Sequence, residues 1–220
     1  QFKPELQALG LSATVAEPDE LRRWLVNQGP MGEINYSKLI TVDGGAKPDI
    51  TILKSKERIP WKGHSAIYSM LEVFEAIKAH RTTLLFVNTR SQAEILFREL
   101  WANNEETLPI ALHHGSLDVS KRRKVEQAMA DNALRAIVAT STLDLGIDWG
   151  DVDLVIQIGA PKNVKRLVQR IGRANHRYNA PSKALLVPAN RFEVIECVAA
   201  LDAVLESDLD GDPRGPGPRD

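Results

Sequence analysis

Three short strings in this sequence combine small hydroxyl residues, glycine or arginine in the way that phosphate-binding sites do. They are NTR at residues 88–90, HHGS at residues 113–116 and TST at residues 140–142. A fourth string, QRIGR at residues 169–173, adds two more arginines. Guanidinium groups, hydroxyl groups and backbone amides beside small residues are the donors that phosphate oxygens accept. These residue types therefore indicate binding to a nucleic-acid backbone, a nucleotide or both.

The charge of the chain is strongly segregated, although 28 Lys and Arg against 29 Asp and Glu leave a net charge of only −1. Residues 154–192 hold eight basic residues and no acidic one, whereas residues 193–212 hold seven acidic residues and no basic one. Concentrated positive charge repels itself unless an anion neutralises it. The basic segment is thus either a phosphate-binding surface or a solvated helix face paired with the acidic segment beside it.

Apolar strands alternate with amphipathic helices along most of the chain, and this order must position the four strings. We predict strands at residues 83–88, 109–112, 134–139, 152–157 and 183–187. We predict helices at residues 91–103, with Ser91 as the cap, and at 120–130, 163–173 and 191–205. Fully apolar strands between helices favour an α/β fold, a parallel sheet with helices on both faces. The strings at 88–90, 113–116 and 140–142 each follow a strand, so they should meet at one edge of the sheet, and we expect the helix that carries QRIGR to face this edge.

The part of the chain before residue 64 follows a different pattern. We predict strands at residues 9–14, 38–42 and 49–53 and a helix at residues 18–26, followed by a charged connector at 54–63. Because the chain opens on Gln1 and soon reaches an apparent strand end, we expect a fragment of a longer protein. Residues 1–63 are expected to be the tail of a preceding domain plus a linker, 64–207 the full domain, and 208–220 a Gly/Pro-rich linker or disordered end.

Several classes of protein are excluded by composition. Hydrophobic residues make up 43% and charged residues 26% of the chain, which is the balance of a globular protein rather than a disordered or fibrous one. No apolar run reaches the ~18 residues that span a bilayer, so no membrane contact is expected. The single cysteine, Cys197, excludes an internal disulfide and fits a cytoplasmic location. Phe86 and Cys197 are expected in the core.

No metal site is expected. His113 and His114 are adjacent, so on an extended segment their side chains point in opposite directions. No further cluster of His, Cys or carboxylate residues completes a set of ligands around them.

The strings also form an ordered set of motifs that resembles superfamily 2 helicases. SAT at residues 12–14 resembles motif III, LLFVNTR at 84–90 motif IV, ATSTLDLGID at 139–148 motif V and QRIGR at 169–173 motif VI. The longer strings ALHHGSL at 111–117 and GIDWGDVD at 146–153 are most similar to the Lhr-type branch, and within it to the bacterial ligase-associated DExH-box DNA helicases. The resemblance covers nearly the whole chain in order.

The resemblance implies the second of two RecA-like domains, the helicase C-terminal domain of the P-loop NTPase type. In that family ATP with Mg²⁺ lies between the two domains, held mainly by the first. This sequence contains no Gly-Lys-Ser/Thr string and no DExH string before Ser12. We therefore expect ATP-dependent helicase activity in a full-length protein and none in this fragment alone.

Motifs III to V supply nucleic-acid, nucleotide and coupling residues in the family. Carried over to this sequence, they imply backbone contacts by Thr89, Arg90, Thr140 and Ser141, and Gly115 and Ser116, between these motifs, are expected to let the chain approach a phosphate. They imply nucleotide contacts by Gly146 and Asp148 and coupling by Ser12, Ala13 and Thr14. Alternatives remain at two positions: Asp148 can be a helix cap or turn carboxylate, and Arg90 a residue that simply begins a helix.

Motif VI supplies the catalytic group of the family, an arginine finger that reaches the γ-phosphate of ATP. Arg173 matches the finger, while Gln169 and Arg170 would support nucleotide or interdomain contacts. The position of the usual second arginine holds His176, and Arg177 follows one place later. The sequence does not decide which of the two takes the role of that arginine. For each arginine the alternative is a surface ion pair, and for His176 a hydrogen bond to a backbone carbonyl.

Together these features predict a motor domain of an ATP-driven 3′→5′ DNA helicase or translocase. The resemblance adds single-stranded DNA and RNA:DNA hybrids as substrates, a role in DNA repair, and a DNA ligase or nuclease as partner. Two alternatives stay open: a non-catalytic nucleic-acid-binding module, and an RNA-acting helicase of the same superfamily. Contacts to the backbone alone do not select the sugar.

Overall fold

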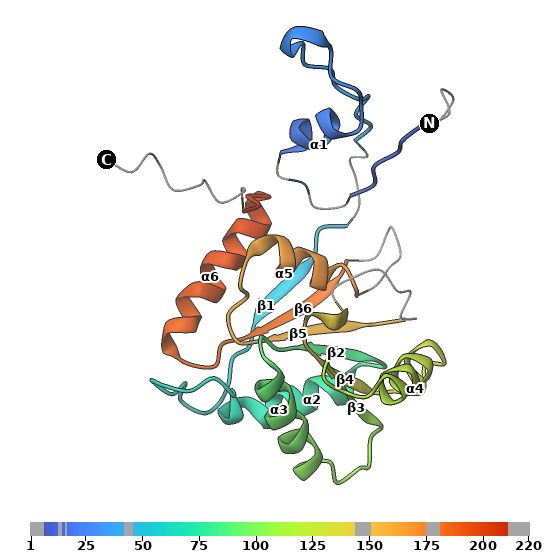
Figure 1. The fold of residues 1–220 in the computed structure, drawn as a ribbon. Helices are drawn as coiled ribbons and strands as arrows, with labels where there is room; N and C mark the ends of the chain where they lie inside the picture. The colour runs from blue at the N-terminus through green and yellow to red at the C-terminus, as the bar shows by residue number, and fades with distance from the viewer. Residues whose placement is uncertain are drawn as a thin grey trace.

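A wholly parallel sheet lies at the centre of the molecule. The computed structural model describes residues 7–12, 15, 17–41, 46–143, 151–174 and 181–210, and within them six strands pair in the order β1-β6-β5-β2-β4-β3 (Figure 1). The strands are β1 (Asp49–Ile52), β2 (Thr83–Phe86), β3 (Ile110–His113), β4 (Ala136–Ala139), β5 (Leu154–Ile158) and β6 (Lys183–Val187). The predicted parallel sheet is confirmed.

Helices cover both faces of this sheet (Figure 1). Buried side chains of α2 (Met70–Ala79) and α3 (Arg90–Ala102) pack on one face. Those of α4 (Val119–Ala130), α5 (Val164–Ile171) and α6 (Arg191–Glu206) pack on the other. The fold is therefore the predicted three-layer α/β arrangement.

The central strands are apolar throughout because both of their faces are covered. Every residue of β2, β4 and β5 is buried. Leu84 and Phe86 join the cluster under α5 and α6, while Leu85 and Val87 join the cluster under α2 and α3. Side chains alternate between the faces of a strand, so a doubly covered strand has no position for a solvent-facing residue. Phe86 and Cys197 are buried as predicted.

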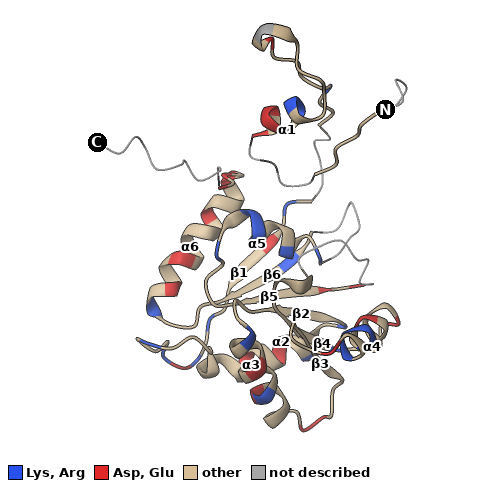
Figure 2. Ribbon diagram, in the orientation of Figure 1, with Lys and Arg blue, Asp and Glu red and all other residues tan. Residues whose placement is uncertain are grey.

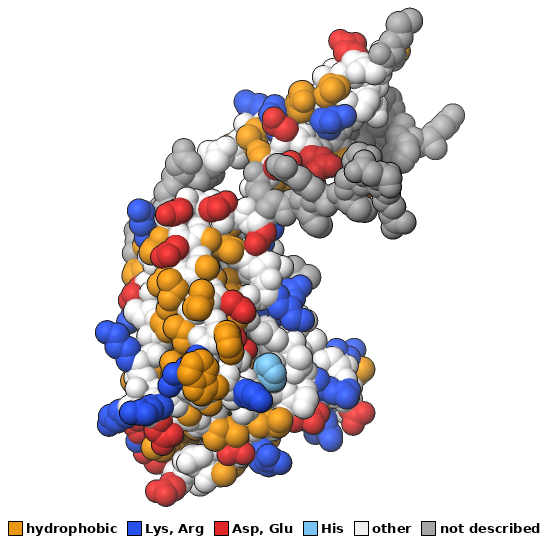
Figure 3. Space-filling model, turned by 90° about the vertical axis from the view of Figure 1, so that its left-hand side faces the viewer, with side chains coloured by type: hydrophobic (Ala, Val, Ile, Leu, Met, Phe, Trp, Pro, Cys, Tyr) orange, Lys and Arg blue, Asp and Glu red, His pale blue; other side chains and the backbone are white. Residues whose placement is uncertain are grey.

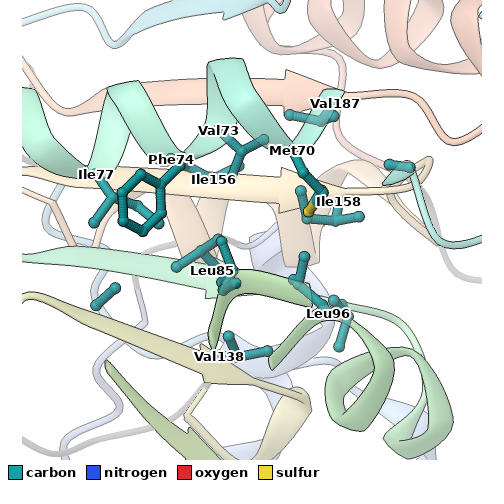
Figure 4. Packing of buried hydrophobic residues seen from close by; sticks show 14 of the residues in the cluster. Met70, Val73, Phe74, Ile77, Leu85, Leu96, Val138, Ile156, Ile158 and Val187 are labelled. Atoms are coloured by element: carbon teal, nitrogen blue, oxygen red, sulfur yellow. The ribbon is translucent and has the colours of Figure 1, made fainter. Parts of the chain in front are cut away.

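Helix α2 is an element that the sequence analysis did not predict. Its buried residues Met70, Val73, Phe74 and Ile77 follow the i, i+3, i+4, i+7 spacing of an amphipathic helix, and Figure 4 shows them packed against strand residues such as Leu85. The short 3-10 helix η2 (Ile67–Ser69) leads into α2.

The segment before β1 stands apart from the sheet in Figure 1. Helix α1 (Pro18–Trp24) is present as predicted, but it has no buried residue. Local contacts hold it: Arg22 donates to the carbonyl of Ser37 and lies 5.0 Å from the Tyr36 ring centroid. The 3-10 helix η1 (Pro30–Gly32) follows. Residues 9–12 and 38–41 form no strand, contrary to prediction, because no strand among the described residues lies beside them to pair with.

Strand β1 belongs to the sheet rather than to a linker. Asp49 to Ile52 pair in parallel with residues 183–186 of β6, and Leu53 N extends the pairing by donating to Leu186 O at 2.8 Å. The sheet therefore begins before residue 64, where the sequence analysis expected the domain boundary. Pairing across more than 130 positions leaves no local signal in the sequence.

The start of the predicted linker at residue 208 is attached to the domain. Ser207 ends α6 in the left-handed conformation, and the Asp210 carboxylate accepts hydrogen bonds from Val164 N and Lys165 N, the first amides of α5. An acidic side chain at a helix N-terminus is favourable because the free amides there carry partial positive charge. Residues 211–220 lie outside the described residues.

The surface around α5 and α6 reflects the segregated charge. In Figure 2 the ribbon of α5 has basic positions in blue, and the neighbouring ribbon of α6 has acidic positions in red. Apolar side chains also gather on the outer side of α6 (Figure 3), where Phe192, Ile195 and Leu205 are exposed, with Trp61 6.4 Å from Phe192 between ring centroids. Among the described residues, no helix combines the length and the apolar character that crossing a membrane requires.

Candidate functional site

The loops after β2, β3 and β4 meet at one edge of the sheet, as their parallel strands require. Arg90 Nη1 donates to Ser116 Oγ at 2.7 Å, which joins the loop after β2 to the loop after β3. Thr140 N donates to His113 O at 3.3 Å, which joins the end of β3 to the start of the loop after β4. The structure thus brings together six predicted site residues: Thr89, Arg90, Gly115, Ser116, Thr140 and Ser141.

Most of these groups face solvent. Thr89, Arg90, Gly115, Ser116 and Ser141 are exposed, and Thr140 is half-buried. A Cβ atom built on Gly115 would lie 3.6 Å from Thr142 Cγ2, an ordinary contact. Internal packing therefore does not require glycine at this position, whereas a backbone approached closely from outside does benefit from it.

Thr89 begins helix α3 through a reciprocal capping box. Its hydroxyl accepts a hydrogen bond from Gln92 N at 3.2 Å, and Gln92 Oε1 accepts from Thr89 N at 3.0 Å. Gln92 Nε2 also donates to His64 O at 2.8 Å, which fixes the connector against the helix. The prediction that Ser91 caps this helix is wrong, because the capping box places the cap two residues earlier.

Arg90 is the first residue of α3, so its guanidinium lies at the positive end of the helix. The side chain is 61% exposed, and its Nε lies 4.0 Å from Glu94 Oε1 one turn later. A cation in this position is unfavourable toward the helix dipole and gains from a second anion. The Arg90 guanidinium can therefore donate to a phosphate while it keeps its hydrogen bond to Ser116.

The adjacent histidines at the end of β3 diverge, as predicted. His113 contacts Thr142 Oγ1 at 2.9 Å and Glu126 Oε1 of α4 at 3.1 Å. His114 is buried on the α3 side, where its Nε2 lies 3.5 Å from Glu94 Oε1. Burial lowers the pKa of His114, and the nearby Arg90 and His113 lower it further, against the opposing effect of Glu94. Among the described residues, no group of three or more His, Cys, Asp or Glu residues could hold a metal ion.

Helix α5 carries Arg170 of the QRIGR string, and Arg173 follows the end of the helix. Asn163 caps it, with its Oδ1 accepting from Arg166 N at 2.8 Å. Gln169 and Arg173 are half-buried, and Arg173 lies just after the helix, its backbone N donating to Arg170 O at 3.0 Å. Arg173 therefore lies at the end of the helix whose start is fixed by Asn163 and Asp210.

Arg170 lies inside the domain, although the sequence analysis expected it to support nucleotide or interdomain contacts. Only 2% of the residue is exposed. Its Nη1 donates to Gln157 Oε1 at 2.6 Å, and its guanidinium carbon lies 4.6 Å from the centroid of the Phe86 ring. Part of the positive charge of the basic segment is therefore used in internal packing.

Five predicted site residues are not placed by the structure. Gly146, Asp148 and His176, and Ala13 and Thr14 of the SAT string, lie outside the described residues. Ser12, the remaining residue of that string, is exposed and belongs to no helix or strand.

Sequence reasoning missed the residues that support this edge from inside. Asn88 Nδ2 donates to Ala160 O at 2.8 Å, and Glu193 Oε2 accepts from Ala160 N at 3.1 Å and Ala189 N at 2.9 Å. Gly159 lies between them at a φ of +79°, where a Cβ would lie 3.4 Å from both Asn88 Nδ2 and Glu193 Oε2. The pair Asn190 and Glu193 resembles a capping box, a signal that could have revealed this role.

The helicase conserved C-terminal domain family matches residues 65–178 of this chain. The chain belongs to this family. The match includes the three loops at the sheet edge and all of α5. It thus covers the residues that the geometry has brought together.

Similar curated proteins are Lhr helicases. The ATP-dependent helicase Lhr-Core of Methanocaldococcus jannaschii is 35% identical over 202 residues, which are 89% of this chain and 23% of that protein. The Lhr helicase/uracil glycosylase of Escherichia coli is 30% identical over 93% of this chain and 16% of its own length. The chain thus spans less than a quarter of each of these two relatives.

Solved structures agree with this family. Helicase Lhr of Mycobacterium smegmatis, bound to ssDNA and AMP-PNP, matches with a TM-score of 0.77 and 32% identity over 91% of this chain and 26% of that one. Yeast Dbp5, bound to RNA and ADP BeF3, matches with a TM-score of 0.63 and 18% identity over 89% of this chain and 46% of that one. The sheet is thus the RecA-like sheet of helicase C-terminal domains, shared with the DEAD-box structure at the level of the fold.

Proposed function

We propose that this domain is the second motor domain of an ATP-dependent DNA helicase or translocase that moves 3′→5′ on single-stranded DNA. The observation that carries the proposal is the exposed Arg90–Ser116 pair, which joins two loops at the carboxyl edge of the sheet beside Thr140. A guanidinium and a hydroxyl held 2.7 Å apart can donate to oxygens of one backbone phosphate. The names of the Lhr relatives support the ATP-dependent helicase part of this assignment.

Binding and hydrolysis are divided between two ends of the domain in this proposal. Arg90, Ser116 and Thr140 hold backbone phosphates. Arg173, at the end of α5, extends toward ATP held by a preceding domain and stabilises the negative charge that develops during phosphoryl transfer. ATP supplies the free energy for movement, and its Mg²⁺ is assigned to the preceding domain because this chain has no Gly-Lys-Ser/Thr string.

The first test is ATP hydrolysis by the full-length protein in the presence of single-stranded DNA. Arg173→Ala is expected to lower kcat by about 10³-fold or more while the Kd for DNA stays unchanged, because the finger acts on the transition state. Arg98→Ala is the matched control, since Arg98 of α3 has a side chain that is 75% exposed and pairs only with Glu99 among the described residues. Equal losses of kcat and DNA affinity in Arg173→Ala would contradict the finger assignment.

The second test concerns the phosphate contacts. Arg90→Ala is expected to weaken DNA binding and to reduce the slope of log K against log salt by about one, because one fewer counterion is released. Arg98→Ala, on the same helix, should leave that slope unchanged. A wild-type slope in Arg90→Ala would remove Arg90 from the interface.

Unwinding assays address the finer parts of the proposal. We expect duplexes with a 3′ single-stranded tail to be unwound and those with a 5′ tail to remain intact, and we expect DNA to stimulate hydrolysis more than RNA. RNA:DNA hybrids as substrates, a repair role and a ligase or nuclease partner follow only from the resemblance to ligase-associated helicases. Stronger stimulation by RNA would favour an RNA-acting helicase, and DNA binding without any hydrolysis would favour a non-catalytic module.

A further inference from the structure

Gln157 is a fully buried polar side chain at the centre of the sheet. In the parallel pairing of β2 with β5, Phe86 is the partner of Gln157, so the two side chains point to the same face of the sheet. The neighbouring side chains on this side of the sheet include the hydrocarbon groups of Leu84, Val155 and Leu186. Only 1% of Gln157 is exposed.

Both ends of the Gln157 amide are engaged. Its Nε2 donates to the carbonyls of Ile158 at 3.0 Å and Gly159 at 3.2 Å. Two carbonyl acceptors on one side fix which end is the nitrogen, so Oε1 must point away from them. The oxygen accepts from Arg170 Nη1 at 2.6 Å.

Gln157 and Phe86 together form a directional seat for the Arg170 guanidinium. The oxygen of Gln157 contacts its edge, and the ring of Phe86 lies under it at 4.6 Å. Among the described residues, Arg170 is the only Lys, Arg, Asp or Glu that is buried. Burying a guanidinium is costly unless its hydrogen bonds are well aligned, so the contact with Gln157 and Phe86 stabilises Arg170 in this orientation.

The seat also fixes helix α5, which has only eight residues. Its hydrocarbon contacts, through Leu167 and Ile171, resist separation from the sheet but do not define rotation about the helix axis as a hydrogen bond does. Arg173 follows Arg170 by three residues, almost one helical turn, and donates its backbone N–H to Arg170 O. A rotation of α5 would therefore displace the Arg173 side chain.

We propose that Gln157 is a positioning residue for the arginine finger: it orients Arg170 and thereby sets where Arg173 reaches. The inference rests on the proposed function and adds to it a residue of β5 outside the QRIGR string. Gln157 contacts neither nucleotide nor DNA in this assignment. A misplacement of about 1 Å far from the reacting atoms can lower a rate by about 10²-fold.

The test uses the full-length protein with Gln157→Leu, which has similar volume and no acceptor. We expect kcat of DNA-stimulated ATP hydrolysis to fall by about 10- to 100-fold, with the Kd for single-stranded DNA unchanged within about twofold. Thr83→Val is the matched control, because Thr83 is a buried polar residue of β2 at the opposite edge of the sheet, with no hydrogen-bond partner for its hydroxyl. It should retain wild-type kcat. Wild-type kcat in Gln157→Leu would overturn the proposal.

A double mutant separates positioning from general destabilisation. If Gln157 acts through Arg173, Gln157→Leu combined with Arg173→Ala should be no slower than Arg173→Ala alone. A further loss that multiplies the two single effects would overturn the proposal. If Gln157→Leu fails to fold, Gln157→Met decides, because it keeps the length of the side chain but lacks the amide oxygen that Arg170 contacts. A folded Gln157→Met with wild-type kcat contradicts the inference.

The same ATP hydrolysis measurements distinguish a failure of the proposed motor function from a failure of the proposed role of Gln157. A wild-type protein without DNA-stimulated hydrolysis would remove the motor function and this inference with it. An active wild type with an inactive Arg173→Ala and a fully active Gln157→Leu would leave the motor function in place and remove only the role of Gln157.

Discussion

The two faces of the sheet are built from the same strands but are packed in different ways. On the α2 and α3 face, α2 packs on the central strands through hydrocarbon, as Figure 4 shows for Val73, Ile77 and Leu85. On the α5 and α6 face, a buried guanidinium and a buried amide interrupt the hydrocarbon. Dispersion and burial stabilise without fixing orientation, whereas a hydrogen bond fixes direction at a cost in desolvation. Packing under α2 therefore mainly stabilises the fold, whereas the hydrogen bond between Arg170 and Gln157 fixes the orientation of α5.

The largest expected effect on stability is on the hydrocarbon face. Leu85→Ala should lower the free energy of unfolding by about 2–5 kcal/mol, because Leu85 is completely buried in the central strand and its removal leaves a cavity. Urea unfolding of the chain measures it. Leu71→Ala on α2, at a residue that is 68% exposed, should stay within about 0.5 kcal/mol of wild type. Similar losses for the two variants would contradict the conclusion that buried hydrocarbon on this face stabilises the fold.

On the other face, loss of one polar partner should be worse than loss of both. Arg170→Met leaves the Gln157 oxygen buried without this donor, which costs about 1–3 kcal/mol. Adding Gln157→Leu should restore part of that loss, since replacing both partners by apolar groups is nearly neutral. Unfolding in urea of the single and double variants measures this coupling. Simple additivity would show that the two side chains do not act as a pair.

A smaller effect on the free energy of unfolding is expected at Thr89, the residue that caps the start of α3. Thr89→Ala removes the capping hydroxyl and should cost about 1 kcal/mol of unfolding free energy, measured in urea. Thr89→Ser keeps the oxygen and should restore stability. If Ser restores stability but not DNA affinity, the threonine methyl group contributes to binding; if Ala costs nothing, the capping box is not formed in solution.

The smallest expected effect is a dependence of stability on pH that arises from His114, the residue after β3. Burial lowers the pKa of His114 in the folded chain, with Arg90 and His113 acting in the same direction and Glu94 against it. The unfolded chain therefore binds the proton more readily, and stability falls as the pH drops below the ordinary histidine pKa of about 6.5. His114→Gln should flatten the acid side of a plot of unfolding midpoint against pH. His64→Gln, at an exposed side chain, is the control.

Much of the architecture could be predicted because its signals are local. Continuous apolar strands and the helices between them identified the parallel sheet, and parallel strands necessarily bring residues 88–90, 113–116 and 140–142 to one edge. The spacing of Met70, Val73, Phe74 and Ile77 also carried a helix signal that went unused.

The features that could not be predicted depend on distant partners. Nothing near Asp49 in the sequence indicates pairing with Lys183. Likewise, an arginine in a basic segment is expected at the surface, and the sequence does not show that the register of Phe86 with Gln157 places a ring and an amide oxygen beside a buried Arg170. The predicted roles of Arg173 and Arg90 are hypotheses that the ATP hydrolysis and DNA-binding experiments test.

Strand β1 has a practical consequence for dissecting such proteins. A fragment cut at residue 64 would keep every helix of the sheet domain but would lose β1, leaving the amide and carbonyl groups of β6 uncovered along one border. Exposed borders of this kind recruit other chains and promote aggregation. A fragment intended for expression should therefore start upstream of Asp49.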